Sequence, residues 1–125
     1  VLTGLDEGEI LLGLNDGQAI IEELLSLGVK QVAVKLGADG ALVGDGTGIS
    51  KVEATKVTVV DNIGAGDAFS AGFLSGVIEG KATKECGAMG CLMGAFAVSS
   101  FGDIEGLPDR EAFERKRTKT TDIYR

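Results

Sequence analysis

Apolar side chains in the first third of the chain recur every three to four positions and so share one helical face: Ile20, Ile21, Leu24 and Leu25. This spacing matches the 3.6-residue period of an α-helix, which would begin at Asp16 and end at Gly28. Residues 31–36 form a run rich in β-branched and apolar residues, which predicts a buried strand. A helix, a short loop and a strand in this order indicate an α/β unit.

The middle of the chain alternates short apolar runs with glycine-rich turns. Residues 37–40 predict a first turn, which leads into a short strand over residues 41–43. Residues 44–48 predict a second turn, and residues 49–52 and 56–60 predict further extended segments. We therefore expect a meander of strands and turns here.

Two helical patterns follow in the second half. Phe69, Phe73 and Val77 stand four positions apart and form one apolar stripe on the first helix. Gly72 and Gly76 lie together, which would let a second backbone approach closely. The other helix begins near residue 83, has a thin glycine face, and turns five residues toward a core: Met89, Leu92, Met93, Phe96 and Ala97. We interpret this stripe as core packing and not as a cofactor site.

The end of the chain is polar and charged. Residues 102–108 predict a linker, and residues 109–114 predict a short final helix. Residues 115–125 are expected to form a basic tail exposed to solvent.

Composition narrows the class of protein. The 125 residues are 44% hydrophobic, with 20 glycines and a single proline, which suits one modest α/β domain. The net charge of −7 argues against binding to nucleic acid or to a membrane surface. The longest apolar run, over residues 88–98, is shorter than the roughly 20 residues that span a bilayer. We therefore expect a cytoplasmic location, and, from the abrupt start at Val1, that this is the C-terminal part of a longer protein.

The residue types present exclude several chemistries. The chain has no histidine, which removes His-based zinc sites, Ser-His-Asp triads and histidine bases. Cys86 and Cys91 are five positions apart in one helical pattern, so they indicate neither a disulfide nor a metal pair. Residues 44–48 are glycine-rich but precede a strand, and we interpret them as a turn and not as a dinucleotide-binding loop.

The clearest chemical signal lies in residues 61–69, Asp-Asn-Ile-Gly-Ala-Gly-Asp-Ala-Phe. Gly64, Ala65 and Gly66 leave the backbone uncovered at the expected start of a helix, whose N–H groups and dipole favour an anion. Asp67 would stand beside that anion in the first helical turn, where a carboxylate can accept a proton from an attacking hydroxyl. Taken alone, the same string could be a tight strand-to-helix turn with an N-terminal acid.

The C-terminal signature of the ribokinase-like, or PfkB-type, carbohydrate kinases resembles a longer pattern in this chain, Asp61-x-x-Gly64-Ala65-Gly66-Asp67-x-x-x-Ala71-Gly72-Phe73-Leu74. The resemblance implies that residues 1–114 are the C-terminal, nucleotide-binding half of a three-layer α/β/α kinase. It implies transfer of the γ-phosphoryl group of ATP to a sugar or sugar-acid hydroxyl, with Mg²⁺ bridging the phosphates. Asp67 would be the general base, and the N–H groups of residues 64–66 would stabilise the transferring phosphoryl group.

Two further elements match the family in part. Gly37 and Gly40 correspond to a Gly-x-x-Gly turn that lies against ATP in these kinases, so with Lys35 they are candidate nucleotide-binding residues. A simple hairpin turn would give the same isolated pattern. Glu7 matches the acid of an Asn-x-x-Glu element that acts on the Mg²⁺–phosphate network through water, although Gly4 stands in place of the Asn.

The sequence indicates the sugar substrate less specifically than it indicates the kinase family. Residues 5–13 and 102–111 look like the 2-keto-3-deoxygluconate kinase branch, while ribokinase-like and fructokinase-like specificities stay open. Asn62 departs from the Thr, Ser or Pro usual in the signature, which we interpret as a tolerated change. Most sugar-reading residues of such kinases lie in the N-terminal half, so we expect this segment to be inactive alone.

Two other classes stay open: a catalytically idle nucleotide-binding module, and a fragment of a dinucleotide-binding oxidoreductase. Under the kinase interpretation the partners are ATP and a small sugar or sugar acid, with neither nucleic acid nor a membrane. A homo-oligomer also stays open, because these kinases often pair through lid strands that this chain does not contain.

Overall fold

The computed structural model describes residues 1–60, 63–99 and 108–123. Their strands form one sheet in chain order: β1 (Leu2–Gly4), β2 (Gln31–Lys35), β3 (Ala41–Asp45) and β4 (Gly48–Val52). β1 and β2 are parallel, whereas β3 is antiparallel to β2 and to β4. The helices are α1 (Leu5–Leu12), α2 (Gly17–Ser26), α3 (Ala65–Ile78), α4 (Thr83–Val98) and α5 (Arg110–Ile123), with a 3₁₀ turn η1 (Gly37–Asp39).

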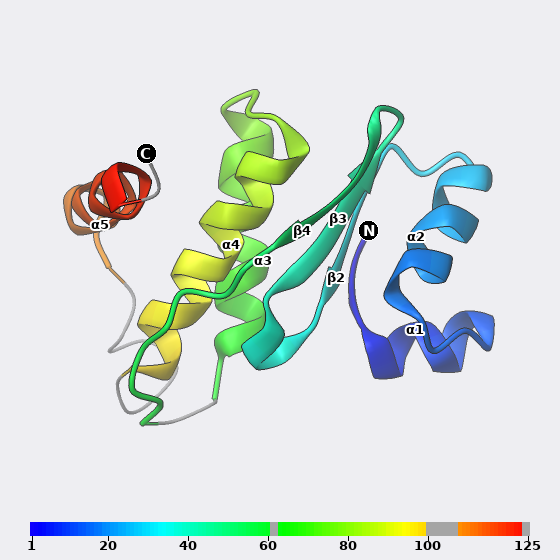
Figure 1. Ribbon diagram of the computed structural model, residues 1–125, viewed down its shortest axis with the longest axis horizontal. Coiled ribbons are helices and arrows are strands. Elements are labelled where there is room, and N and C mark those ends of the chain that lie inside the picture. Colours follow the sequence, from blue (N-terminus) through cyan, green and yellow to red (C-terminus); the bar gives the residue numbers. More distant parts are fainter. Residues whose placement is uncertain (61–62, 100–107, 124–125) are drawn as a thin grey trace.

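The sheet lies between two helical layers (Figure 1). α1 and α2 lie on one side, α3 and α4 lie on the other, and α5 lies outside α3 and α4. The α/β class expected from the sequence is confirmed. No described helix is long and apolar enough to cross a membrane.

The apolar stripe of α2 builds the core on its side of the sheet. The Asp16 carboxylate caps this helix by accepting a hydrogen bond from the Ala19 N–H at 3.0 Å. Four fully buried aliphatic side chains then join α2 to β2: Ile20, Ile21, Val32 and Val34. Each such burial contributes about 1.5–3 kcal/mol, so this contact holds β2 firmly in place. The helix and strand predicted between residues 16 and 36 are confirmed.

Glycines set the distance between α3 and α4, which run antiparallel against the other face of the sheet. A Cβ at Gly72 would lie 2.5 Å from the Met89 carbonyl oxygen, and a Cβ at Gly76 would lie 2.8 Å from Cys86 Sγ. Both distances are shorter than van der Waals contact, so the close approach predicted from these glycines is confirmed. Phe69 of α3 is buried, with its ring against Gly90 of α4.

Two features of the meander differ from the prediction. The second turn is shorter, because the Asp45 carboxylate accepts hydrogen bonds from the N–H and hydroxyl of Thr47 at 2.8 and 2.6 Å and closes a tight turn. Residues 56–60 do not form a strand. They cross from the sheet toward α3 and α4, where the Val60 N–H donates to the Val98 carbonyl oxygen at 2.7 Å.

The final helix is longer than the sequence predicted. α5 continues to Ile123 instead of ending at residue 114, so the basic residues after 114 are helical. The expectation of a solvated tail is wrong for Arg117, whose guanidinium lies 2.7 Å from the Glu85 carboxylate on α4. Residues 102–107 of the predicted linker lie outside the described residues.

Candidate active site

Residues 64–74 of the signature form the start of α3, whereas Asp61 and Asn62 lie outside the described residues. Gly64 has a φ of 81°, in the left-handed region that glycine adopts readily, and the helix begins directly after it. The Ala68 N–H donates to the Gly64 carbonyl oxygen at 2.9 Å and opens the helical hydrogen-bond series. The N–H groups of Ala65, Gly66 and Asp67 precede that series, so they have no intrahelical acceptor. Together with the helix dipole they favour an anion at this end.

Lys35 brings the end of β2 to the same place. Its ammonium Nζ lies 3.4 Å from the position that a Cβ on Gly66 would occupy. The two residues are far apart in sequence, and the fold joins them because β2 ends beside the start of α3. A flexible cation beside exposed backbone N–H groups makes this corner strongly attractive to a phosphate.

A cavity of about 800 Å³ opens next to this corner. Its walls come from the β2–η1 connection, from the segment that leaves β4, and from the facing sides of α3 and α4. The lining includes five of the candidate residues predicted from the sequence: Lys35, Gly37, Gly40, Ala65 and Gly66. Other lining residues give it a largely apolar wall with one more cation: Val57, Val59, Phe69, Ala95, Val98 and Lys56. An apolar slot beside an anion-binding helix end suits a nucleotide.

Gly40 fixes one wall of this cavity. It is buried, with a φ of 90°, and a Cβ there would lie 2.0 Å from the Val52 carbonyl oxygen and 2.8 Å from the Ala54 N. No side chain fits against that backbone, so the residue has to be glycine. Gly40 thereby determines how the chain leaves β4 to form the wall at residues 54–59.

Asp67 is exposed in the first turn of α3 and is not among the residues that line the cavity. It directly follows Gly66, which does line it. Its carboxylate is therefore open to a second molecule that approaches from outside the cavity.

Glu7 lies on a different element at the same edge of the sheet. The parallel pairing of Gly4 with Lys35 places the start of α1 beside the end of β2. The Glu7 carboxylate accepts a hydrogen bond of 3.4 Å from the hydroxyl of Thr3, and Glu7 does not line the cavity. Within the described parts of the chain, no cluster of three or more His, Cys, Asp or Glu side chains could hold a metal ion.

The sequence interpretation missed the α4 wall. The predicted core stripe of this helix packs in the core, with Met89 and Leu92 buried, whereas the cavity is lined by Cys91, Gly94, Ala95 and Val98. Their spacing of three, four and seven positions places them on one face, and their small size is the signal that a ligand could pack there. Burial and the nearby Glu53 raise the pKa of the Cys91 thiol to about 11, so this wall is neutral and apolar.

Solved structures share this fold. Ribokinase from Thermotoga maritima is 29% identical, with a TM-score of 0.82 over 94% of this chain and 41% of that one. Aminoimidazole riboside kinase from Salmonella enterica, in complex with aminoimidazole riboside and an ATP analogue, is 31% identical, with a TM-score of 0.79 over 91% of this chain and 40% of that one. The ribokinase-like fold expected from the sequence is confirmed.

Sequence relatives agree with the structures. The 2-dehydro-3-deoxygluconokinase of Bacillus subtilis is 40% identical over 109 residues, which are 86% of this chain and 34% of that protein. The chain thus spans about a third of the length of such a relative. The family model for pfkB family carbohydrate kinases matches residues 1–110. Because this match covers most of the chain and includes both the glycine turn and the signature, the chain belongs to the pfkB family of carbohydrate kinases.

Proposed function

We propose that this chain forms the nucleotide-binding and catalytic part of a kinase that transfers the γ-phosphoryl group of ATP to a sugar or sugar-acid hydroxyl. The observation that carries the proposal is the corner where Lys35 meets the uncapped start of α3 beside a largely apolar cavity. A nucleoside triphosphate has the matching shape, with a flat apolar base at one end and concentrated negative charge at the other.

In this proposal the base packs in the cavity against the valines of the crossing segment and the small residues of α4. Gly37 and Gly40 let the backbone approach the nucleotide closely. The phosphates extend toward Lys35 and toward the N–H groups of Gly64, Ala65 and Gly66, which bind the charge that develops during transfer.

A magnesium ion fits the residues present. Mg²⁺ is usually held by one or two carboxylates, substrate phosphates and water, so a single acid such as Glu7 is sufficient on the protein side. Glu7 would contribute through water, at the sheet edge where Lys35 also lies. When bound, Mg²⁺ would supply positive charge to the phosphate oxygens.

Asp67 would act as the general base. Its carboxylate takes the proton of the acceptor hydroxyl while that oxygen bonds to the γ-phosphorus, and the bond to the β–γ bridging oxygen breaks to release ADP. The exposure of Asp67, next to the cavity but not in its lining, agrees with this role because the acceptor has to enter from the side opposite the nucleotide.

For the acceptor we propose 2-keto-3-deoxygluconate. The similarity to the Bacillus subtilis 2-dehydro-3-deoxygluconokinase supports it, as do residues 5–13 and 102–111. The second candidate is a ribokinase-type or fructokinase-type acceptor, favoured by the structural similarity to ribokinase. A catalytically idle nucleotide-binding segment is a further alternative. We also propose a cytoplasmic location, which rests on the composition, and the family resemblance leaves a homo-oligomer open.

The test uses the full-length protein and compares two exposed aspartates that each stand in the first turn of a helix. Asp67→Asn should keep ATP affinity within about threefold and lose phosphoryl transfer by about 10²- to 10⁴-fold, the usual contribution of a general base. Asp6→Asn, the matched control on α1, should keep near-normal turnover. ATP consumption is measured with 2-keto-3-deoxygluconate, fructose and ribose. Near-normal turnover in Asp67→Asn would sink the assigned base, and turnover with ribose or fructose alone would refute the proposed acceptor.

A further inference from the structure

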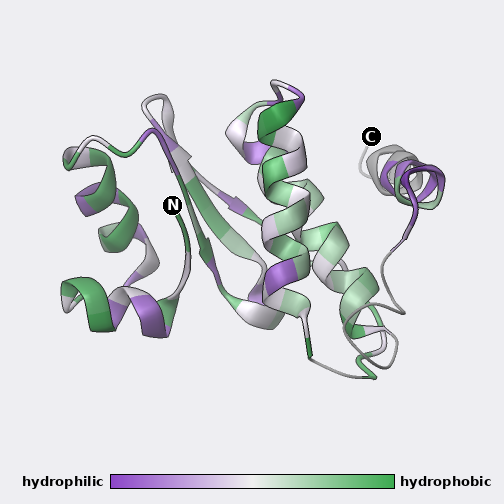
Figure 2. Ribbon diagram, turned by 180° about the vertical axis from the view of Figure 1, so that it is seen from behind, coloured by the Kyte–Doolittle hydropathy of each residue, from purple (hydrophilic) through white to green (hydrophobic). Residues whose placement is uncertain are grey.

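An apolar side chain near the start of α5 anchors this helix to the rest of the protein. Phe113 is only 6% exposed and packs with Met89 and Leu92 of α4. The remainder of α5 is far more hydrophilic than α3 and α4 (Figure 2). Over residues 110–117, the part of α5 whose burial is described, Phe113 is the one buried apolar side chain, so this helix needs other contacts to stay in place.

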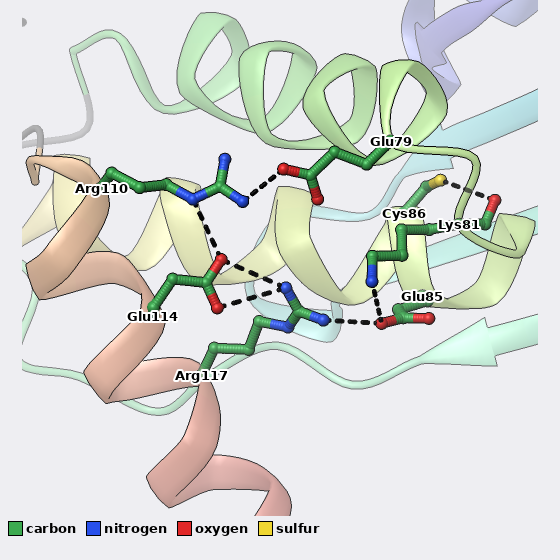
Figure 3. A network of polar contacts seen from close by, with 7 residues as sticks. All are labelled: Glu79, Lys81, Glu85, Cys86, Arg110, Glu114 and Arg117. Atoms are coloured by element: carbon green, nitrogen blue, oxygen red, sulfur yellow. Dashed lines mark hydrogen bonds and ion pairs between the residues drawn. The ribbon is translucent and has the colours of Figure 1, made fainter.

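Ion pairs supply these contacts, in a row of alternating charges that crosses from α3 through α5 to α4 (Figure 3). Arg110 contacts the Glu79 carboxylate at the end of α3, and its Nε lies 3.2 Å from Glu114. Arg117 lies 3.4 Å from Glu114 and 2.7 Å from Glu85 at the start of α4. The Arg110 guanidinium also lowers the pKa of the Glu79 carboxyl, which keeps this row charged.

The spacing of three side chains along α5 makes its inner face complementary to the surface of α3 and α4. Arg110, Phe113 and Arg117 stand at i, i+3 and i+7, so two cations flank one aromatic on the same helical face. Each of these side chains has its own partner on the helices beneath: Glu79 for Arg110, Glu85 for Arg117, and the apolar side chains of Met89 and Leu92 for Phe113. A further cavity of about 200 Å³ lies under this contact, lined by residues of all three helices.

We propose that α5 is a charge-latched helix, which docks through Phe113 and the two arginines and detaches as a unit while α3 and α4 stay folded. The ion pairs are partly exposed to solvent, and such pairs are individually weak and screened by salt. α3 and α4 instead interlock through glycine contacts at backbone level. Local opening of α5 is therefore easier than opening of the helices beneath it.

Hydrogen–deuterium exchange of the full-length protein tests the latch. Between about 0.1 M and about 1 M NaCl the Debye length falls from about 10 Å to about 3 Å. Peptides from residues 110–123 should then exchange about fivefold faster, whereas peptides from residues 65–78 should change by less than about twofold. Equal salt responses in the two segments, or an α5 that is unprotected at both salt concentrations, would overturn the proposal.

Two arginine variants separate docking from helix stability. Arg117→Met and Arg115→Met each remove one positive charge and one ion pair within α5, but only Arg117 reaches α4. Arg117→Met should speed α5 exchange about fivefold at low salt, and Arg115→Met by less than about twofold. In Glu85→Gln, adding Arg117→Met should have little further effect, since the shared pair is already gone. Equal effects of the two arginine variants, or full additivity in the cycle, would refute the latch.

Discussion

The packing of α3 against α4 predicts opposite effects on stability when two glycines in these helices, Gly72 and Gly94, are each changed to alanine. At Gly72 an added Cβ would lie 2.5 Å from the carbonyl oxygen of Met89 and 2.9 Å from the carbonyl carbon of the same residue. Ordinary contact begins near 3.4 Å, so the helices would have to separate by about 0.9 Å there. At Gly94 the added Cβ would lie 3.6 Å from the Ala65 carbonyl oxygen, which is an ordinary contact.

These distances set the expected free energies of unfolding. Alanine is favoured over glycine inside a helix by about 0.8–1 kcal/mol, and this gain applies to both sites. Overpacking a core costs about 1–3 kcal/mol, and Gly72 should fall at the upper end because its neighbour is backbone and cannot rotate away. Gly72→Ala should therefore destabilise by about 2 kcal/mol, whereas Gly94→Ala should be neutral or stabilise by up to about 1 kcal/mol.

The assay is urea unfolding of the full-length protein followed by circular dichroism, in which a change of midpoint at constant slope reports stability. Because Gly94 also lines the cavity proposed to hold the nucleotide, both variants are measured without ATP. If Gly72→Ala is as stable as the wild type, or if Gly94→Ala loses as much stability as Gly72→Ala, then glycine packing does not set the distance between these helices.

Two further predictions concern the cavity wall and the response to acid. Gly40→Ala should weaken ATP binding at least tenfold, because left-handed strain of roughly 1–2 kcal/mol is added to the displacement of the Ala54 backbone. Gly46→Ala is the control, since Gly46 faces open space and its change should leave ATP binding unaltered. Equal ATP affinities of the two variants by calorimetry would contradict this prediction. The Thr47 and Thr83 hydroxyls lower the pKa of Asp45 from 3.8 to about 2, so its stabilisation is complete above the unfolded pKa and disappears as pH falls toward about 2. Between about pH 5 and about pH 2, the free energy of unfolding of the wild type should thus fall by about 1 kcal/mol more than that of Asp45→Asn. This figure is reduced because Asp45 is partly exposed to solvent. Parallel curves of unfolding free energy against pH, from urea unfolding, would rule the prediction out.

Local signals in the sequence predicted those parts of the fold that local physics controls. The cap at Asp16, the stripe of α2 and the small residues of α3 act over a few positions, and each has the predicted place. Residues 37–40 predict the glycine turn and residues 61–67 the signature. The turn and the start of α3 line the same cavity only because β2 ends beside α3, which no local pattern specifies.

The misses have the same physical origin. Residues 56–60 alternate as a strand would, but β4 is the last strand of the described sheet and these residues extend toward α4 instead. The end of α5 was placed too early because its stability comes partly from ion pairs with α3 and α4, which are invisible in the sequence of α5 alone. The α4 wall was not predicted, because small residues that line a cavity and small residues that pack against another helix look alike in a sequence.

The antiparallel arrangement of α3 and α4 also gives the cavity an electrical direction. α3 presents its N-terminal end at Ala65, and α4 presents its C-terminal end at Val98, so opposite poles of two helix dipoles face the same space. A molecule that carries its negative charge at one end experiences a torque in this field. The fold can thus sort the head of such a ligand from its tail before any individual hydrogen bond forms.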